Sequence, residues 1–322
     1  MMTSPATPEP GPDPLTASDL HRRMFPTPLG EVAVRLSAAA SSMTDKGSST
    51  ATVYLHGAAG SWTTFIPLLA AQTATAQRHT VLLDLPGWGE SAQGFDASEL
   101  SLPAMAAAVT DILRALGYRR WNLVGHSMGG FLALHMAATD PQHTAGVVVI
   151  SATTFGVAQS AREPVRGLFR FPAFTGMLLV MRAMAALGRP GQALVRSIGR
   201  TSLMRLLMAP FFAMPAAVSA EVLRNLGSDA RPAAFAAAAR ISAHYDFGGW
   251  RGIRCPVLAI RGDNDVFTPA SDLDRLTGLV PHATGLTIPG CGHFANIEKP
   301  AALNELLTHA LHAADHEGTQ LL

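Results

Sequence analysis

The sequence has few cysteines, few charged residues and no excess of charge of either sign. Its 322 residues include two cysteines, Cys255 and Cys291, which are too few for a disulfide framework. There are 24 basic and 23 acidic residues, so the net charge of +1 creates no overall field that would attract a nucleic-acid backbone or an anionic lipid surface. We therefore expect no nucleic-acid partner.

The chain also lacks an uninterrupted hydrophobic run. Its most apolar stretch, residues 171–188, contains Gly176 and Arg182 and falls short of the ~20 apolar residues that a membrane-spanning helix needs. Residues 1–24 are rich in proline and lack the apolar region of a signal peptide, so we expect them to be disordered. These features predict a soluble, cytoplasmic protein without stable membrane insertion.

Hydrophobic residues, by contrast, make up 48% of the chain and charged residues 15%, which suits a large core. Short β-branched runs alternate with Ala- and Leu-rich helical patterns, which predicts an α/β protein with a mostly parallel sheet. Helical patterns end at Gly117 and before Pro141, and another begins at Pro300. We predict strands at residues 31–37, 52–56, 80–85, 122–126, 146–151, 257–262 and 285–289. Residues 37–51 are expected to form a polar surface loop.

Residues 155–250 break this alternation. They contain no convincing strand and are rich in Ala, Leu, Met, Phe and Arg, with six of the 13 methionines of the chain. We interpret them as a helical cap inserted between two parts of one core, residues 25–154 and 251–312, with residues 313–322 as a polar tail. The pattern does not reveal which methionines line a pocket, because methionine fills irregular cores as readily.

One serine lies in a turn that is suited to catalysis. Residues 125–129 read Gly-His-Ser-Met-Gly and match G-x-S-x-G, with an apolar strand pattern before them and a helical pattern after them. The same pattern also occurs in glycine-rich turns whose serine has no role. A serine hydroxyl is a poor nucleophile alone and needs a base, which needs an orienting group in turn.

Candidate partners follow two later strands. Asp263 and Asp265 come after the predicted strand 257–262, and His293 comes after the predicted strand 285–289. Because the carboxyl ends of parallel strands meet at one edge of a sheet, these side chains can converge with Ser127. Either aspartate could orient the histidine on these grounds.

Five short motifs follow one another along the chain: HGAAG (56–60), DLPGWGES (84–91), GHSMGG (125–130), GDND (262–265) and GH (292–293). In this order and spacing they resemble the motifs of the α/β-hydrolase fold serine hydrolases, esterase- or lipase-like members with a helical cap. The resemblance implies an eight-stranded-type, mostly parallel sheet flanked by helices.

The resemblance also implies the roles of individual residues. Ser127 is the expected nucleophile and His293 the general base. The family places its acid three residues after the glycine of the GDND motif, which selects Asp265. The backbone N–H groups of Met128 and Ala58 are expected to form the oxyanion hole. No metal or cofactor is implied.

Aromatic side chains beside the motif loops are candidates for the wall of an apolar substrate pocket. They are Trp62, Phe155, Phe267 and Phe294. Cys291 lies two residues before His293, and we expect it to be accessible to thiol reagents.

The function that we expect is hydrolysis of a carboxylic ester of a small or medium apolar substrate through an acyl-enzyme on Ser127. A serine at this position argues against relatives that use an aspartate nucleophile. The alternative is a C–C bond hydrolase of aromatic-ring catabolism, although that group commonly has asparagine and tryptophan where this chain has His126 and Phe294. An acyltransferase and a non-catalytic binding protein of the same fold are weaker alternatives, and the oligomeric state stays open.

Overall fold

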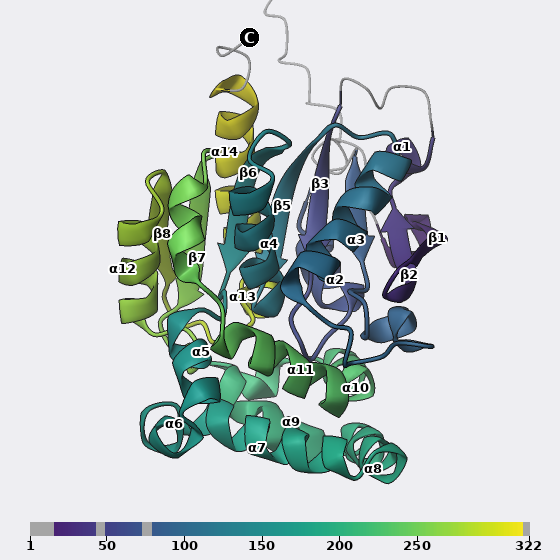
Figure 1. The fold of residues 1–322 in the computed structure, drawn as a ribbon, viewed down its shortest axis with the longest axis vertical. Helices are drawn as coiled ribbons and strands as arrows, with labels where there is room; N and C mark the ends of the chain where they lie inside the picture. Colours follow the sequence, from purple (N-terminus) through teal and green to yellow (C-terminus); the bar gives the residue numbers. More distant parts are fainter. Residues whose placement is uncertain (1–15, 43–48, 73–78, 318–322) are drawn as a thin grey trace, which may run out of the picture.

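The structure, a computed structural model, describes residues 16–42, 49–72 and 79–317, with the side chains of the last helix described to residue 311. Its centre is one eight-stranded sheet with the strand order β1-β2-β4-β3-β5-β6-β7-β8 (Figure 1). The strands are β1 (His21–Thr27), β2 (Gly30–Leu36), β3 (Thr50–Leu55), β4 (Thr80–Leu83), β5 (Arg120–His126), β6 (Thr144–Ile150), β7 (Val257–Gly262) and β8 (Ala283–Ile288).

The sheet is parallel from β4 to β8 and antiparallel where β2 joins β1 and β4. Successive side chains of a strand point to opposite faces, so a strand that is covered on both sides is apolar throughout. Val53 of β3 accordingly belongs to one core cluster, whereas the adjacent Tyr54 belongs to another. The continuous apolar runs of the sequence follow directly from this arrangement.

Helices cover the two faces of the sheet. On one face lie α3 (Leu102–Ala115), α4 (Met128–Thr139), α12 (Ala270–Leu279) and the turn η6 (Phe247–Gly252). On the other lie η2 (Trp62–Phe65), α2 (Ile66–Ala70), α13 (Ala295–Glu298) and α14 (Pro300–Glu317). Gly117 has a φ of +88°, as expected of the glycine that ends the helix before it.

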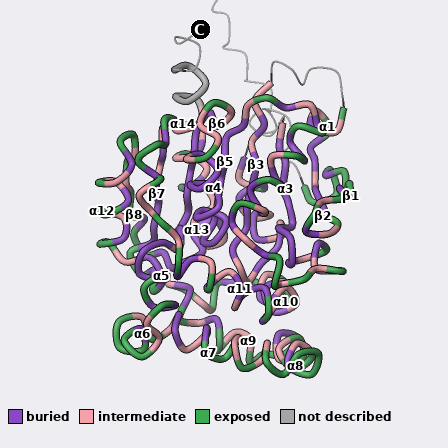
Figure 2. The backbone as a smooth tube through the Cα atoms, in the orientation of Figure 1, coloured by how far each residue is buried: buried purple, intermediate pink, exposed green. Residues whose placement is uncertain are grey.

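Between β6 and β7 the chain forms helices and turns. The α-helices are α5 (Phe155–Arg162), α6 (Pro164–Arg170), α7 (Pro172–Ala186), α8 (Arg189–Gly199), α9 (Leu203–Met208), α10 (Ala220–Asp229) and α11 (Pro232–Ala243), and the short turns are η4 (Ala209–Phe211) and η5 (Pro215–Ala217). We call these elements the cap helices. Figure 1 shows α10 and α11 next to the carboxyl ends of the strands, with α6 to α9 as an outer layer. In Figure 2 the central strands are mostly buried, whereas this outer layer is largely exposed or half-buried.

The N-terminal part of the fold differs from the sequence-based expectation. Residues 21–24, expected to be disordered, belong to β1, because His21 to Thr27 pair antiparallel with β2 over their whole length. Residues 1–15 lie outside the described residues. The predicted surface loop 37–51 begins with a short helix, α1 (Ala38–Ser41), whose Ala40 is buried, and ends with the first residues of β3. Among the described residues, no helix has the length and apolar character needed to cross a membrane.

Candidate active site

Ser127 lies in a strained turn between β5 and α4. Its φ is +53°, which an L-residue rarely adopts, and the turn holds it there because α4 begins at the next residue. The close approach of strand and helix needs both glycines of the motif. A Cβ on Gly125 would lie 2.3 Å from the carbonyl oxygen of Gly129, and a Cβ on Gly129 would lie 2.0 Å from that of Leu55. The structure thus has the geometry that the G-x-S-x-G pattern predicts.

His293 and Asp265 form a buried pair at the same edge of the sheet. His293 Nδ1 lies 2.9 Å from Asp265 Oδ1 and 3.1 Å from Oδ2, and both side chains are almost fully buried. Backbone N–H groups of Phe267 and Thr268 also donate to Asp265 Oδ1. Burial opposes ionisation of Asp265, but the charge and hydrogen bond of His293 outweigh it, so the pKa of Asp265 is lowered.

Asp263, the other candidate for the acid, lies away from His293 on the surface. Asp263 is exposed, and its carboxylate accepts hydrogen bonds from the backbone N–H of Cys291 and the side chain of Asn264. The bond from Cys291 joins the loops that follow β7 and β8. Of the two aspartates, the structure brings only Asp265 against the imidazole of His293.

Ser127 and His293 line one cavity. Among the hydrogen bonds of the described residues, none joins the Ser127 hydroxyl to the His293 imidazole. In sites without substrate, the contact between nucleophile and base is commonly looser than in the substrate complex. The backbone of His293 is held as well, because His126 Nε2 lies 3.0 Å from the His293 carbonyl oxygen.

The loop after β3 fixes the peptide that carries the Ala58 N–H. The carbonyl oxygen of Gly57 lies 2.8 Å from His56 Nδ1 and accepts a hydrogen bond from Gly60 N–H. In a trans peptide the N–H points opposite to the carbonyl, so these bonds set the direction of the Ala58 N–H. His56 Nε2 accepts from the N–H of Leu85, so the proton of a neutral imidazole is on Nδ1. Burial lowers the pKa of His56 to about 4, which keeps it neutral.

Both residues that carry the candidate oxyanion-hole donors lie beside Ser127. Met128 is the first residue of α4, so its N–H has no partner within the helix. Among the hydrogen bonds of the part of the chain that the structure describes, neither Met128 N–H nor Ala58 N–H donates to a protein acceptor, and both residues line a cavity with Ser127.

The indole of Trp88 donates to the Ala58 carbonyl oxygen, 2.6 Å away. Through this contact the DLPGWGES motif helps to shape the loop that carries Ala58.

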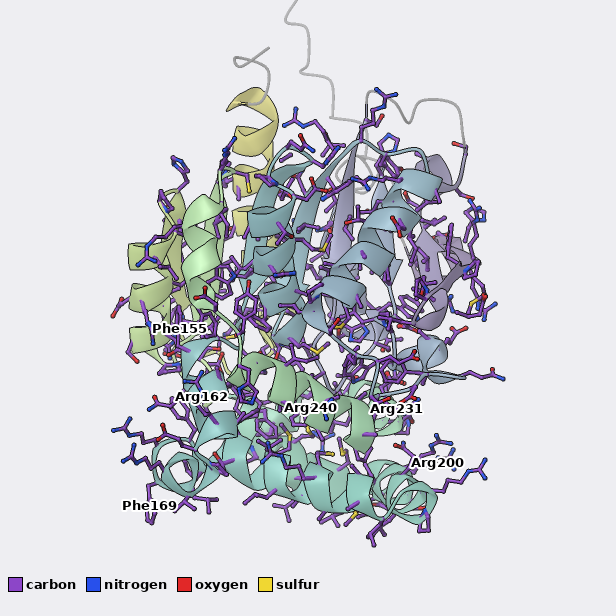
Figure 3. The ribbon with its side chains drawn as sticks, viewed as in Figure 1. Phe155, Arg162, Phe169, Arg200, Arg231 and Arg240 are labelled. Carbon is purple, nitrogen blue, oxygen red and sulfur yellow. The ribbon has the colours of Figure 1, made fainter. Side chains whose placement is uncertain are left out.

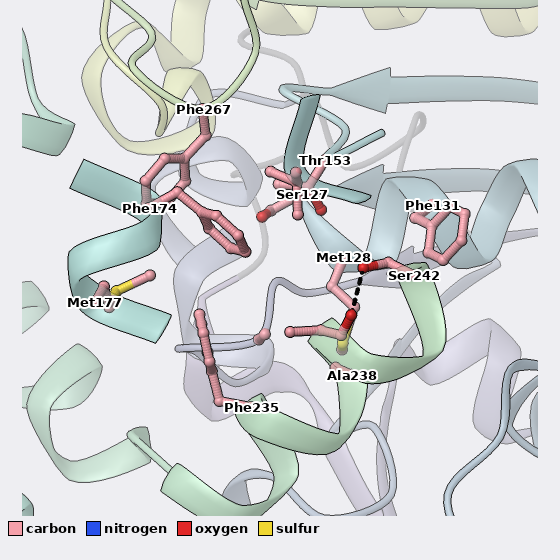
Figure 4. Close-up of a pocket in the computed structure, with 13 residues that line it drawn as sticks. Ser127, Met128, Phe131, Thr153, Phe174, Met177, Phe235, Ala238, Ser242 and Phe267 are labelled. Carbon is pink, nitrogen blue, oxygen red and sulfur yellow. Dashed lines mark hydrogen bonds between the residues drawn. The ribbon is translucent and has the colours of Figure 1, made fainter. Parts of the chain in front are cut away.

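Two adjoining cavities meet at Ser127 and share five lining residues: Ala58, Ser127, Met177, Phe235 and Phe267. Figure 4 shows Phe174 and Met177 of α7 and Phe235 of α11 around the space beside Ser127, with Ser242 on the other side. The lining residues are mostly apolar, and the polar ones are Thr64, His126, Ser127, Thr153, Ser242 and His293. The contributions of α7 and α11 were not predictable, because apolar residues that face a cavity have the same helical spacing as residues that pack in a core.

The four predicted pocket aromatics have different positions. Phe267 lines both cavities and Phe294 lines one. Trp62 and Phe155 are among the lining residues of neither, which corrects the prediction. Trp62 packs under the guanidinium of Arg35, and Phe155 packs in an aromatic cluster with Phe247. Both side chains therefore pack against other residues and not against the space beside Ser127.

Cys291 also differs from expectation, because it is fully buried rather than accessible. Burial raises the pKa of its thiol to about 12, so the reactive thiolate is suppressed. Both cysteines are free. Among the described residues, no group of three or more His, Cys, Asp or Glu side chains is arranged to hold a metal ion.

A family model described as the alpha/beta hydrolase fold matches residues 51–300, which is most of the chain. The chain belongs to the α/β-hydrolase fold family. The match includes Ser127, Asp265 and His293, and the eight-stranded, mostly parallel sheet with helical insertions agrees with it.

Relatives of this α/β-hydrolase have different chemistries in their names. It is 28% identical over 265 residues to a dihydrolipoyllysine-residue acetyltransferase component of the acetoin cleaving system from Pseudomonas putida, covering 79% of this chain but 61% of that protein. It is 27% identical to a 2-hydroxy-6-oxononadienedioate/2-hydroxy-6-oxononatrienedioate hydrolase from Paraburkholderia phymatum, covering 79% and 84% of the two chains. An epoxide hydrolase structure from an endophytic Streptomyces superimposes with a TM-score of 0.70 at 20% identity, covering 92% and 97%, which shows a shared fold.

Proposed function

We propose that this α/β-hydrolase cleaves carboxylic esters of small or medium apolar acyl groups through an acyl-enzyme on Ser127. The observation that carries the proposal is the meeting, at one apolar cavity, of a serine in a strained turn with a buried His293–Asp265 pair. A serine beside an oriented imidazole is the arrangement that acyl transfer requires.

The chemistry follows from these positions. His293 Nε2 takes the proton of the Ser127 hydroxyl as the oxygen bonds to the ester carbonyl carbon. The N–H groups of Ala58 and Met128 stabilise the negative charge on the carbonyl oxygen. The C–O bond to the alcohol then breaks, and His293 returns its proton to the leaving oxygen. Water repeats the sequence on the acyl-enzyme and releases the acid.

The cavity lining favours an uncharged acyl group. Of the described residues that line the two cavities, none is Lys or Arg, and the residues contributed by the cap helices are apolar apart from Ser242. A carboxylate in such a place would be desolvated without a partner, at a cost of several kcal/mol. The lining therefore supports an apolar ester over a doubly charged substrate.

A second candidate is C–C bond hydrolysis of the kind named for the Paraburkholderia phymatum relative, which the similarity over most of both chains supports. It would use the same serine, histidine and aspartate. The dioate in that relative's name denotes two carboxylates, whereas no Lys or Arg is among the described residues that line this cavity.

Labelling with a fluorophosphonate and hydrolysis of short p-nitrophenyl esters test the proposal. We expect the wild-type protein to react with both and Ser127→Ala to react with neither. Ser242→Ala is the matched control, because Ser242 lines the same cavity but donates its hydroxyl proton to the Ala239 carbonyl. A wild-type protein that is neither labelled nor active on esters, or labelling that survives Ser127→Ala, would contradict the proposal. Cleavage of a vinylogous diketone without any ester hydrolysis would favour the second candidate.

A further inference from the structure

The outer layer of the cap helices exposes an unusual share of the apolar surface of the molecule. Among the described residues, thirteen large hydrophobic side chains are exposed, and eleven of them lie between Val165 and Met214. Phe169 is 86% exposed, Val165 73% and Leu206 70%. Soluble proteins expose single apolar side chains routinely, but a concentration of this kind marks an interaction surface.

The same layer carries a strong positive charge that the balance of the whole chain conceals. Between Arg162 and Met208 the sequence has eight arginines and a single acidic residue, Glu163. These arginines are a third of the 24 basic residues of the chain, whereas Glu163 is one of its 23 acidic residues. The net charge of +1 therefore arises from a basic cap layer and an acidic remainder, and the layer can attract an anion that the whole chain would not.

Most of these arginines are available for an external partner, whereas Arg162, Arg182 and Arg205 donate to backbone carbonyl oxygens. Of the ion pairs between described residues, one involves this segment, that of Arg166 with Glu163. Six of the eight arginines are exposed: Arg162, Arg166, Arg170, Arg189, Arg196 and Arg200. Figure 3 shows Phe169 and Arg200 at opposite ends of the outer layer, with Phe169 directed away from the sheet and Arg200 extending to the side.

We propose that the outer face of α6 to α9 is a docking surface for anionic lipid bilayers. Exposed Phe, Leu and Val side chains mixed with arginine suit the boundary between headgroups and acyl chains, where apolar groups enter the bilayer and guanidinium groups pair with phosphate. This mode needs no spanning helix. A second copy of the chain fits less well, because a symmetric contact would bring two arginine-rich faces together.

The position of α7 connects this surface with the cavity. Its Phe174 and Met177 line the cavity, whereas Val180, on the same helix, is 55% exposed. A bilayer bound to the outer face would therefore lie against a helix that covers Ser127. The docking proposal itself is independent of the chemistry at the serine.

Vesicle co-sedimentation of the full chain tests the proposal. We expect binding to vesicles of phosphatidylcholine with about one-third phosphatidylserine, weaker binding to phosphatidylcholine alone, and weakening as salt is raised. The triple variant Arg166→Gln, Arg170→Gln, Arg200→Gln should bind the anionic vesicles about 100-fold more weakly, at about fivefold for each arginine. Ser127→Ala should bind like the wild type, because binding does not use the reaction.

Matched controls separate the surface from the net charge. The variant Arg119→Gln, Arg251→Gln, Arg254→Gln removes the same charge from exposed sites away from α6 to α9 and should bind like the wild type. Phe169→Ser should weaken binding to both kinds of vesicle, whereas Leu286→Ser, at an exposed site on β8, should not. Circular dichroism confirms that each variant is folded.

Three results would overturn the proposal. The first is a wild-type protein that does not bind the anionic vesicles, and the second is an equal loss in the two triple variants. The third is a concentration-dependent dimer that Phe169→Ser dissociates, since that result would assign the face to a second copy of the chain.

Discussion

At the scale of single residues, the candidate site depends on backbone geometry as much as on side chains. The strained φ of Ser127 is tolerated because Gly125 and Gly129 let β5, α4 and the end of β3 come into contact. The Ala58 N–H is directed by bonds to the neighbouring carbonyl of Gly57, one of them from His56. Residues that never touch a substrate therefore decide where an oxyanion would be stabilised.

Asp265→Asn should lower kcat by about 10⁴-fold while the protein remains folded. In the wild type, the backbone N–H groups of Phe267 and Thr268 donate hydrogen bonds to a carboxylate oxygen of Asp265. Asparagine keeps one oxygen that can accept both bonds. Its amide nitrogen would then face His293 Nδ1 and donate to it, which moves the imidazole proton to Nε2. An imidazole protonated at Nε2 cannot accept the proton of Ser127. Steady-state kinetics on a p-nitrophenyl ester, with thermal unfolding, measures both effects.

Asp263→Asn is the control at the residue scale, because it makes the same chemical change two positions away on an exposed side chain. It should keep kcat close to the wild-type value. Near-normal activity of Asp265→Asn, or an equal loss in the two variants, would remove Asp265 from the proposed triad.

At the scale of elements, the cap helices are bonded directly to the loop that carries His293. The Glu298 carboxylate accepts hydrogen bonds from the N–H groups of Gly292, Ala213 and Met214. The backbone N–H of His293 also donates to the Phe211 carbonyl. The segment 211–214 belongs to the cap region, and Gly292 directly precedes His293. Glu298 therefore connects the cap region to the loop that carries His293, and we treat it as a positioning residue.

Glu298→Gln should therefore affect both stability and turnover. Glutamine has one acceptor oxygen in place of two, so at least one of the three N–H groups loses its partner. We expect the free energy of unfolding to fall by about 2 kcal/mol and kcat/KM to fall by about tenfold. Chemical denaturation and ester hydrolysis measure these changes. Glu305→Gln, at an exposed site on α14, should change neither, and a Glu298 variant with wild-type kinetics would contradict the positioning role.

The elements of the core were predictable because local pattern and tertiary context agree there. All seven predicted strands are present, and the apolar β-branched runs of the central ones suit strands that are covered on both faces. Strand β1 was missed because its exposed residues, such as Arg22 and Arg23, give a pattern that is not apolar. The antiparallel pairing with β2 defines it, and pairing cannot be read from a short polar segment.

In the candidate site, the motif residues were predictable from the sequence but the walls of the cavity were not. Ser127, Asp265 and His293 lie in short motifs at strand ends, and the topology of a parallel sheet brings such ends together. The walls of the cavity were not predictable, since Phe174 and Phe235 come from cap helices whose relative packing decides which side chains face the serine. Trp62 and Phe155 were misplaced for the same reason.

At the scale of the whole molecule, two buried histidines make stability depend on pH. Burial lowers the pKa of His56 to about 4, and burial together with the nearby His293 lowers the pKa of His126 to about 3, from the usual 6.5. Both imidazoles are therefore neutral in the folded state. The unfolded chain binds protons at a higher pH than the folded chain, so acid favours unfolding.

The pH dependence has a definite direction and range. Because the folded pKa of each histidine lies below the unfolded value, its stabilising contribution is complete above about pH 6.5. The contribution is lost as the pH falls toward 4 for His56 and toward 3 for His126. One such histidine changes the free energy of unfolding by at most about 1.4 kcal/mol per pH unit. The carboxyl groups of Asp84 and Asp272 act in the opposite sense, since burial raises their pKa, whereas Asp265, whose pKa is lowered, acts in the same sense as the histidines.

A comparison of variants isolates the histidine contribution from that of the carboxyl groups. We expect the free energy of unfolding in urea to fall more steeply between pH 7 and pH 4.5 for the wild type than for His56→Gln. The variant cannot take up a proton at position 56. The two slopes should differ by about 1 kcal/mol per pH unit near pH 5. His244→Gln replaces an exposed histidine and should keep the wild-type slope. Equal slopes in the wild type and His56→Gln would mean that position 56 does not remain neutral on folding, and the proton placement that directs the Ala58 N–H would then be wrong.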